Sequence, residues 1–231
     1  MLTVELDTLG LEVGAAVLDL GCGRGRHMHA LQARTDLRIV GVDLSLADLE
    51  AARAGLTSDT AALCVGDTRH LPFGDAAFDV VICAEMLEHI RDYRLAIAEI
   101  ARVLKPGGRL GVSVPRDWPE WICWRLNSAY RRAPGGHVRI FNARALKRDI
   151  EAAGLHHRRT HGAHGLHAPY WWLQCLLWDR REQARSVALY HRFLVWDIMK
   201  RPRLTRLLAC IADPLMGKSV VLYFDRNTRP A

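Results

Sequence analysis

Short apolar runs alternate with helical patterns along the first half of the chain. Helical segments separate several of these runs: one begins after Ser45, a suitable N-cap, and another extends from about Tyr93 to Leu104. Lys105-Pro106-Gly107-Gly108 ends the second helix, because Pro and Gly interrupt helical structure. Runs of this kind predict buried, mostly parallel strands in an α/β fold. We expect these strands at residues 17–20, 37–42, 61–65, 78–83 and 109–114.

The first strand leads into three glycines at alternate positions, Gly21, Gly23 and Gly25. Glycine allows a sharp turn and a close approach to a ligand, because it has no Cβ. A strand, a glycine turn and a helix N-terminus together form a nucleotide-type cradle. The dinucleotide fingerprint G-x-G-x-x-G requires a small third residue, but Arg26 stands at that position. The turn therefore favours S-adenosylmethionine over a dinucleotide.

Acidic residues follow the second and third strands. Asp43 ends the run 37–42, where a carboxylate can accept both ribose hydroxyls of a nucleoside. The third run ends in Gly66-Asp67, and Leu71-Pro72-Phe73 follows shortly after.

This succession resembles the class I S-adenosylmethionine-dependent methyltransferases, in particular the group that acts on small molecules and lipids. The resemblance implies a Rossmann-like sheet of seven strands, of which the last two pair antiparallel. It extends over roughly residues 14–155, in the expected order and spacing. The residues that carry it are 17–25, 41–43, 66–67, 71–73, 78–81, 87–89 and 103–108.

The resemblance assigns seven residues to the cofactor: Asp19, Gly21, Gly23, Asp43, Asp67, Thr68 and Cys83. Gly21 and Gly23 would pass under the methionine portion, and Asp43 would bind the ribose hydroxyls. Asp67 would accept the exocyclic amine of adenine, beside the backbone amide of Thr68. Asp19 would bind the cofactor amine through water or, as an equal alternative, fix the glycine turn. The carbonyl of Cys83 would face the same amine, while its thiol fills the core.

The second half of the chain differs chemically from the first. All seven tryptophans lie beyond Pro115, and the net charge is −4 over residues 1–116 and +11 over residues 117–231. Helices are expected over 118–132 and over 142–153, the latter capped by Asn142. The last two strands are expected near Leu155 and at 218–225, with about fifty mostly helical residues between them, whose last helix, after residue 202, should be short. We therefore divide the chain into a cofactor-binding core (1–164), a helical cap insertion (165–217) and the final strand with its tail (218–231).

Two interpretations of the Trp-rich insertion stay open. Its aromatic residues could fill the core of a packed helical cap. Alternatively, they could form the entrance for a greasy acceptor at a membrane surface, since interfacial helices combine Trp and Leu with flanking Arg and Lys. Tyr170, Trp171 and Trp172 begin the insertion and are the candidate acceptor-binding residues.

Histidines beside the aromatic segment are the candidate bases. His164 and His167 lie where the sixth strand should reach the pocket mouth, and His137 follows two glycines. A base is needed if the acceptor is a hydroxyl, a phenol or an acidic carbon. His89 matches a histidine that is frequent in the family, where packing is as good an explanation as catalysis. No metal site is expected, because neither H-E-x-x-H nor paired cysteines occur.

These features favour a methyltransferase for a hydrophobic or amphiphilic small molecule: a quinone, isoprenoid, polyketide or lipid-linked glycan, with O-methylation as the expected reaction. The basic, aromatic second half keeps a nucleic-acid methyltransferase open as an alternative. A non-catalytic cofactor-binding subunit is a further alternative. Scattered cysteines and the lack of a signal-like N-terminus or an 18-residue apolar run predict a cytoplasmic protein, with contact to an anionic membrane surface as an option.

Overall fold

The protein, described here by a computed structural model, is built on one seven-stranded sheet. The structure describes residues 2–34, 36–57, 59–133 and 135–228. The strand order is β3-β2-β1-β4-β5-β7-β6, and β7 alone runs antiparallel to its neighbours. The expected Rossmann-like methyltransferase sheet is thereby confirmed. Its strands are β1 (Ala16–Leu20), β2 (Arg38–Asp43), β3 (Ala61–Val65), β4 (Phe78–Ala84), β5 (Leu104–Pro115), β6 (Leu155–Ala163) and β7 (Ser219–Arg226).

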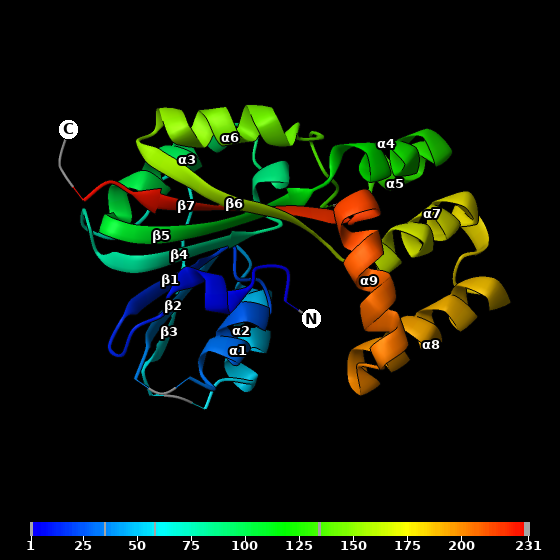
Figure 1. Ribbon diagram of the computed structural model, residues 1–231, viewed down its shortest axis with the longest axis horizontal. Coiled ribbons are helices and arrows are strands. Elements are labelled where there is room, and N and C mark those ends of the chain that lie inside the picture. Colours follow the sequence, from blue (N-terminus) through cyan, green and yellow to red (C-terminus); the bar gives the residue numbers. More distant parts are fainter. Residues whose placement is uncertain (1, 35, 58, 134, 229–231) are drawn as a thin grey trace.

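Helices cover both faces of the sheet, as Figure 1 shows. One face carries α1 (Arg26–Leu31) and α2 (Leu46–Ala54), and the other carries α3 (Tyr93–Val103) and α6 (Ala143–Ala152). The expected caps are present: Ser45 accepts from Asp48 N–H, and Asn142 accepts from the N–H groups of Arg144 and Ala145. Strand β1 is buried along its whole length, because helices pack on both faces of the sheet.

A helical cap stands at one end of the sheet (Figure 1). The predicted helical insertion between β6 and β7 is confirmed, and its third helix is longer than expected. A second segment joins it after β5, where the single helix expected over 118–132 is interrupted at the extended residue Asn127. The cap therefore comprises α4 (Asp117–Leu126), α5 (Ser128–Arg132), α7 (Ala168–Leu176), α8 (Arg185–Lys200) and α9 (Arg203–Met216). The division at residues 164 and 217 stays a prediction.

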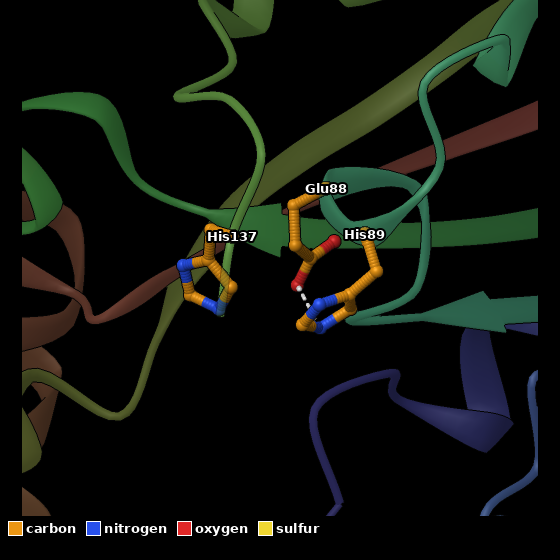
Figure 2. A group of neighbouring side chains, drawn as sticks. All are labelled: Glu88, His89 and His137. Carbon is orange, nitrogen blue, oxygen red and sulfur yellow. Dashed lines mark ion pairs between the residues drawn. The ribbon is translucent and has the colours of Figure 1, made fainter. Parts of the chain in front are cut away.

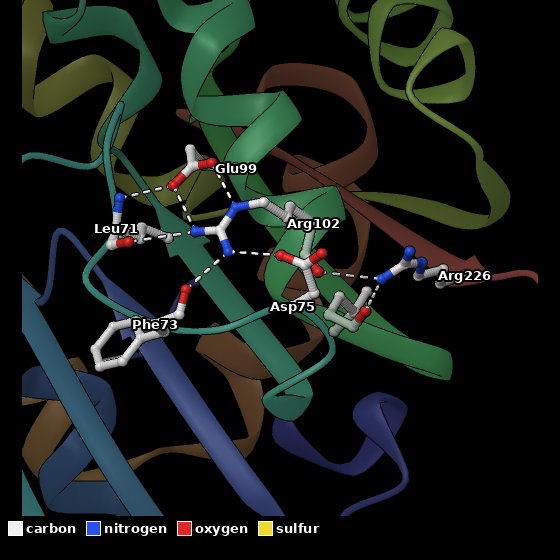
Figure 3. Close-up of polar contacts among 7 residues, drawn as sticks. Leu71, Phe73, Asp75, Glu99, Arg102 and Arg226 are labelled. Atoms are coloured by element: carbon white, nitrogen blue, oxygen red, sulfur yellow. Dashed lines mark hydrogen bonds and ion pairs between the residues drawn. The ribbon is translucent and has the colours of Figure 1, made fainter.

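Arg102 of α3 fixes the loop that follows β3 (Figure 3). Its guanidinium donates to the Glu99 carboxylate and to the carbonyl oxygens of Leu71 and Phe73. Glu99 also accepts from the N–H of Leu71 at 2.7 Å. The loop that begins at Asp67, next to the carboxyl end of β3, is thus anchored on α3.

No helix within the described residues is both long and apolar enough to cross a bilayer.

Candidate active site

The carboxyl ends of four parallel strands border a cavity of about 630 Å³. Ligands of open α/β sheets bind at this edge, where the strand order reverses. Five of the seven predicted cofactor residues line it: Gly21, Gly23, Asp43, Asp67 and Thr68. Another cavity, of about 360 Å³, lies at the opposite edge of the sheet, and its lining includes Arg38, Asp79 and Lys105.

The glycine turn has the geometry that a close-fitting ligand requires. Gly21 and Gly23 have φ values of +69° and +51°, a region that residues with a Cβ rarely adopt. A Cβ on Gly21 would lie 2.4 Å from the Met86 side chain, whereas one on Gly23 would point into open space. The backbone therefore approaches the cavity without side-chain obstruction.

Asp43 is held with its carboxylate at the cavity wall. It accepts hydrogen bonds from Gly23 N–H at 2.8 Å and from Ser45 N–H at 2.9 Å. Each carboxylate oxygen has a further lone pair, so both remain able to accept a ribose hydroxyl. These backbone bonds fix the orientation of the carboxylate.

Asp67 has a partner that its sequence position does not reveal. Arg69 donates to both carboxylate oxygens through its side chain and to one through its backbone N–H. These hydrogen bonds lower the pKa of Asp67 to about 2, so the group is ionised at neutral pH. The Arg69 side chain also lines the cavity.

Asp19 and Cys83 lie behind the cavity wall. Cys83 is fully buried in the core, as expected for its thiol. Asp19 is 1% exposed, and its Oδ2 has no hydrogen-bond partner among the described residues. Burial raises the pKa of Asp19 to about 7, and the neighbouring His27 ring, whose pKa burial lowers to about 3, offers no positive charge. A buried carboxyl with one unpartnered oxygen beneath a glycine turn fits a ligand that brings an amine.

Asp19→Asn is expected to change stability and cofactor binding in opposite directions. The pKa of Asp19 is raised from 3.8 to about 7, so the associated stability is present below about pH 4 and lost as pH rises through 7. At about pH 8.5 the variant should be more stable by about 2 kcal/mol, because removing the buried charge outweighs the cost of burying an amide. Affinity for S-adenosylmethionine should fall. Urea unfolding and calorimetry measure the two effects, and a loss of stability at high pH would contradict the unpaired charge.

Within the site, a second cavity of about 280 Å³ adjoins the cavity of about 630 Å³, and Glu85 lines both. His137, His164 and His167 all line this cavity, although the chain separates them by up to thirty residues. Trp171 lines it as well, together with Tyr130 and Lys218. The structure thus brings together all three candidate bases and one of the three candidate acceptor-binding residues.

The other two aromatic candidates lie elsewhere. Trp172 stacks against Trp118, with ring centroids 5.6 Å apart, and its Nε1–H donates to the carbonyl of Pro119 at 3.0 Å. It therefore anchors α7 on α4. Tyr170 packs near Tyr190 and lines a separate groove on the cap surface.

Glu120 on α4 is a buried charge centre that sequence reasoning missed. This fully buried carboxylate accepts from His137 Nδ1 at 2.8 Å and from Tyr130 Oη at 3.3 Å, and it pairs with the Lys218 ammonium. Burial acts to raise its pKa, but the His137 hydrogen bond and the Lys218 charge outweigh burial and lower the pKa to about 2. Glu120 is consequently ionised and orients the His137 ring, with Nδ1 as the bonded nitrogen.

His164 and His167 are kept neutral. Burial lowers the pKa of His164 to about 3, and it lowers the pKa of His167 as well. His164 has a positive φ of +64° and shares a hydrogen bond of 3.2 Å with the Thr3 hydroxyl. Among the described residues, no hydrogen-bond partner is seen for Nδ1 of His167.

Three further groups meet at the boundary of the two cavities. Glu85 follows β4 with a positive φ of +54°, a strained conformation that is frequent at functional sites. Glu88 and His89 follow in the 3₁₀ turn Leu87–His89. Figure 2 shows that Glu88, His89 and His137 point toward one another. Burial, followed by the charge of Glu85, raises the pKa of Glu88 well above its usual range.

Glu85, Glu120 and Lys218 carry only weak signals in the sequence. Glu85 is distinguishable by ending a buried strand at the cofactor edge of the sheet. Glu120 and Lys218 lie 98 residues apart, and only the folding of the cap onto the sheet makes them a pair.

Comparisons with known proteins show the family to which the chain belongs. Residues 18–112 match the family model of a methyltransferase domain. The chain is 35% identical over 188 residues to 27-O-demethylrifamycin SV methyltransferase of Amycolatopsis mediterranei, covering 79% of this chain and 68% of that protein. It is also 35% identical over 161 residues to a ubiquinone biosynthesis O-methyltransferase of Idiomarina loihiensis, covering 66% of this chain and 65% of that protein.

A solved structure shows the same fold. A chain from the Haloferax volcanii complex between the Trm112 methyltransferase activator and a methyltransferase superposes with a TM-score of 0.68 and 21% identity, covering 96% of this chain and 87% of that chain.

The present chain spans between 38% and 46% of the length of the first curated relatives that it matches.

The chain belongs to the class I S-adenosylmethionine-dependent methyltransferases. S-adenosyl-L-methionine is the cofactor of this family, and the features of the larger cavity fit it. They are an unobstructed glycine turn and, at Asp43, a carboxylate with free acceptor positions, while the buried carboxyl of Asp19 lies behind the wall.

Proposed function

We propose that this protein methylates a hydroxyl group of a hydrophobic or amphiphilic small molecule. The observation that carries the proposal is the second cavity, which meets the cofactor cavity at Glu85 and is lined by three histidines and Trp171. The neutral His164 and His167 supply a proton acceptor, and the rings of Trp171 and Tyr130 offer apolar contact to the acceptor.

The acceptor class follows from the size and lining of this cavity. A volume of about 280 Å³ admits one ring system or a short segment of a larger molecule. The printed names of the two relatives, one a 27-O-demethylrifamycin SV methyltransferase and one a ubiquinone biosynthesis O-methyltransferase, support an oxygen acceptor on a ring-containing molecule. A quinol, an isoprenoid, a polyketide or a lipid-linked glycan fits this description.

The residues of the chain align the acceptor and take up its proton. When bound, S-adenosylmethionine supplies the methyl group, whose C–S bond breaks toward sulfur as the acceptor oxygen forms the new C–O bond. Trp171 and Tyr130 would hold the acceptor in line, and such alignment contributes much of the rate. His167 would receive the hydroxyl proton, because Thr3 already engages His164 and Glu120 engages His137.

His167→Ala is expected to lower turnover by about 10²–10⁴-fold while cofactor affinity stays unchanged. Because burial lowers the pKa of His167 below 6.5, the ring stays neutral at mildly acidic pH. The acid limb of the wild-type rate profile should therefore lie below pH 6.5. The measurement is transfer of radioactive methyl from S-adenosylmethionine to simple quinols, with His157→Ala on the outer strand as the control. Full turnover by the His167 variant would exclude it as the base.

The cap also presents an apolar face, for which we propose contact with an anionic membrane surface. Its side chains are exposed on α8 and α9, and Leu189, Met199, Leu204, Leu207, Ile211 and Leu215 are each more than half exposed. Exposed cations flank them: Arg192, Lys200, Arg201, Arg203 and Arg206. Apolar side chains rimmed by Arg and Lys match the chemistry of an interfacial helix, and the net charge of +11 over 117–231 complements anionic lipid.

Vesicle flotation tests this contact. Binding to vesicles with anionic lipid should exceed binding to neutral vesicles, and Leu207→Asp with Ile211→Asp should abolish it. Leu95→Asp, which places a charge on an exposed leucine of α3, is the matched control and should leave binding intact. Equal flotation of all variants, or a dimer that the double substitution dissociates, would show that lipid does not cover this face.

A further inference from the structure

The buried carboxylate of Glu88 accepts no hydrogen bond from any described residue. The residue is 0% exposed, and neither Oε1 nor Oε2 accepts a hydrogen bond. Leaving a carboxylate uncompensated in the interior is costly, so such a group is normally paired or bound to a metal. Glu85 is a second acid close enough to act on Glu88, and it is half-buried at the boundary of the two cavities.

Two imidazoles converge on this carboxylate (Figure 2). One ligand atom from each of Glu88, His89 and His137 lies within 4.8 Å of the others, and His89 Nε2 is 3.9 Å from Glu88 Oε1. Two ligands of one ion at about 2.1 Å lie at most about 4.2 Å apart. Three ligands of one ion lie about 3.4–3.6 Å from one another, so a shift of up to about 0.7 Å in each side chain would bring all three atoms to one ion.

The surroundings hold these side chains in place. The Val138 N–H donates to the Glu88 carbonyl at 2.9 Å, which ties the segment that carries His137 to the 3₁₀ turn. Glu120 accepts from Nδ1 of His137, so Nε2 is left as its free nitrogen. A carboxylate behind a ligating histidine is the usual arrangement around protein-bound metals, since it fixes the ring and increases its basicity.

The cluster lies where methyl transfer would take place. His89 lines the cofactor cavity, His137 lines the acceptor cavity, and Glu85 lines both. An ion held between them would face the acceptor oxygen and the methyl group at once.

We propose that Glu88, His89 and His137 bind a divalent first-row transition ion, with coordination positions left open for the acceptor. Two imidazoles and a carboxylate suit the divalent ions of the first transition row from Mn²⁺ to Zn²⁺. They suit Mg²⁺ less well, because Mg²⁺ prefers oxygen ligands and retains its bound water. The ion would lower the pKa of a bound hydroxyl and orient its oxygen, while His167 remains to take the proton. This role rests on the proposed function, whereas metal binding itself does not.

The experiment is titration of Co²⁺ and Zn²⁺ into the untagged, chelator-treated chain, without cofactor or acceptor. Wild type should bind one ion, develop the visible absorption of protein-bound Co²⁺, and melt at a higher temperature with the ion. Glu88→Gln, His89→Ala and His137→Ala should each weaken binding by about 100-fold or more, and Glu120→Gln by about 10–100-fold. His164→Ala, in the same cavity but outside the cluster, should bind as wild type does.

Glu88→Gln keeps the test independent of misfolding. It keeps the shape of Glu88 and carries no charge, so the metal-free variant should be at least as stable as wild type yet show no metal-dependent rise in melting temperature. Wild type that binds no better than this variant, or that shows no absorption with Co²⁺, would overturn the proposal. Metal binding without methylation of any hydroxyl would instead overturn the proposed function and leave the site standing.

Discussion

Trp172→Ala is expected to destabilise the protein, whereas the adjacent Trp171→Ala should spare stability and abolish methylation of the acceptor. Trp172 stacks on Trp118 and donates to the Pro119 carbonyl, so its loss detaches α7 from α4. The cost should be about 2–4 kcal/mol, somewhat below that of a fully buried Trp. Trp171 lines the acceptor cavity, where its ring is 6.0 Å from that of Tyr130.

Urea unfolding, calorimetry with S-adenosylmethionine and methyl-transfer assays separate the two roles. Both variants should bind the cofactor as wild type does, because neither ring lines the cofactor cavity. Trp196→Ala, on the exposed face of α8, is the control for losing a tryptophan without either role. If Trp171→Ala retained full turnover, this cavity would not be the acceptor site.

The fold of the first half of the chain and the cofactor side of the site could be predicted from the sequence, because the residues that define them are close together in the chain. The buried runs before Gly21 and Asp43 are short and continuous, and parallel strands place their carboxyl ends at one edge. Five predicted cofactor residues follow those strand ends directly, and all five line the cavity. The break at Asn127 escaped prediction, because an extended residue between two helical patterns leaves no period change to detect.

The acceptor side depends on contacts between distant segments. Trp171 and Trp172 are adjacent and chemically identical, and only the packing of α7 on α4 decides which of them lines the cavity. Glu88 and His137 lie 49 residues apart in the chain, so they come together only through the path of the loop before α6. The motif Glu-Met-Leu-Glu-His at 85–89 was available as a signal, but its two acids acquire meaning only in the structure, where Glu88 is buried and Glu85 lines both cavities.

Glu120→Ala is expected to cost about 3–5 kcal/mol of folding free energy, because it leaves a buried cation without its partner. The Lys218 side chain is 12% exposed and pairs with this carboxylate, which also accepts from His137, Tyr130 and Trp124. The pKa of Glu120 is lowered from 4.5 to about 2, so its stabilisation is present above about pH 4.5 and lost as pH falls through 2. The difference between wild type and Glu120→Gln in urea unfolding should accordingly shrink in acid.

A double substitution distinguishes the structural role of Glu120 from its positioning role. Glu120→Leu with Lys218→Met replaces the ion pair by apolar groups of similar size, which often restores stability. Turnover should stay low in this stable variant, because His137 would lack the acceptor that fixes its ring. Loss of less than about 1 kcal/mol in Glu120→Ala would contradict the buried pair. Recovery of turnover together with stability would show that Glu120 only supports the cap. The His137 ring would then function without the carboxylate that orients it.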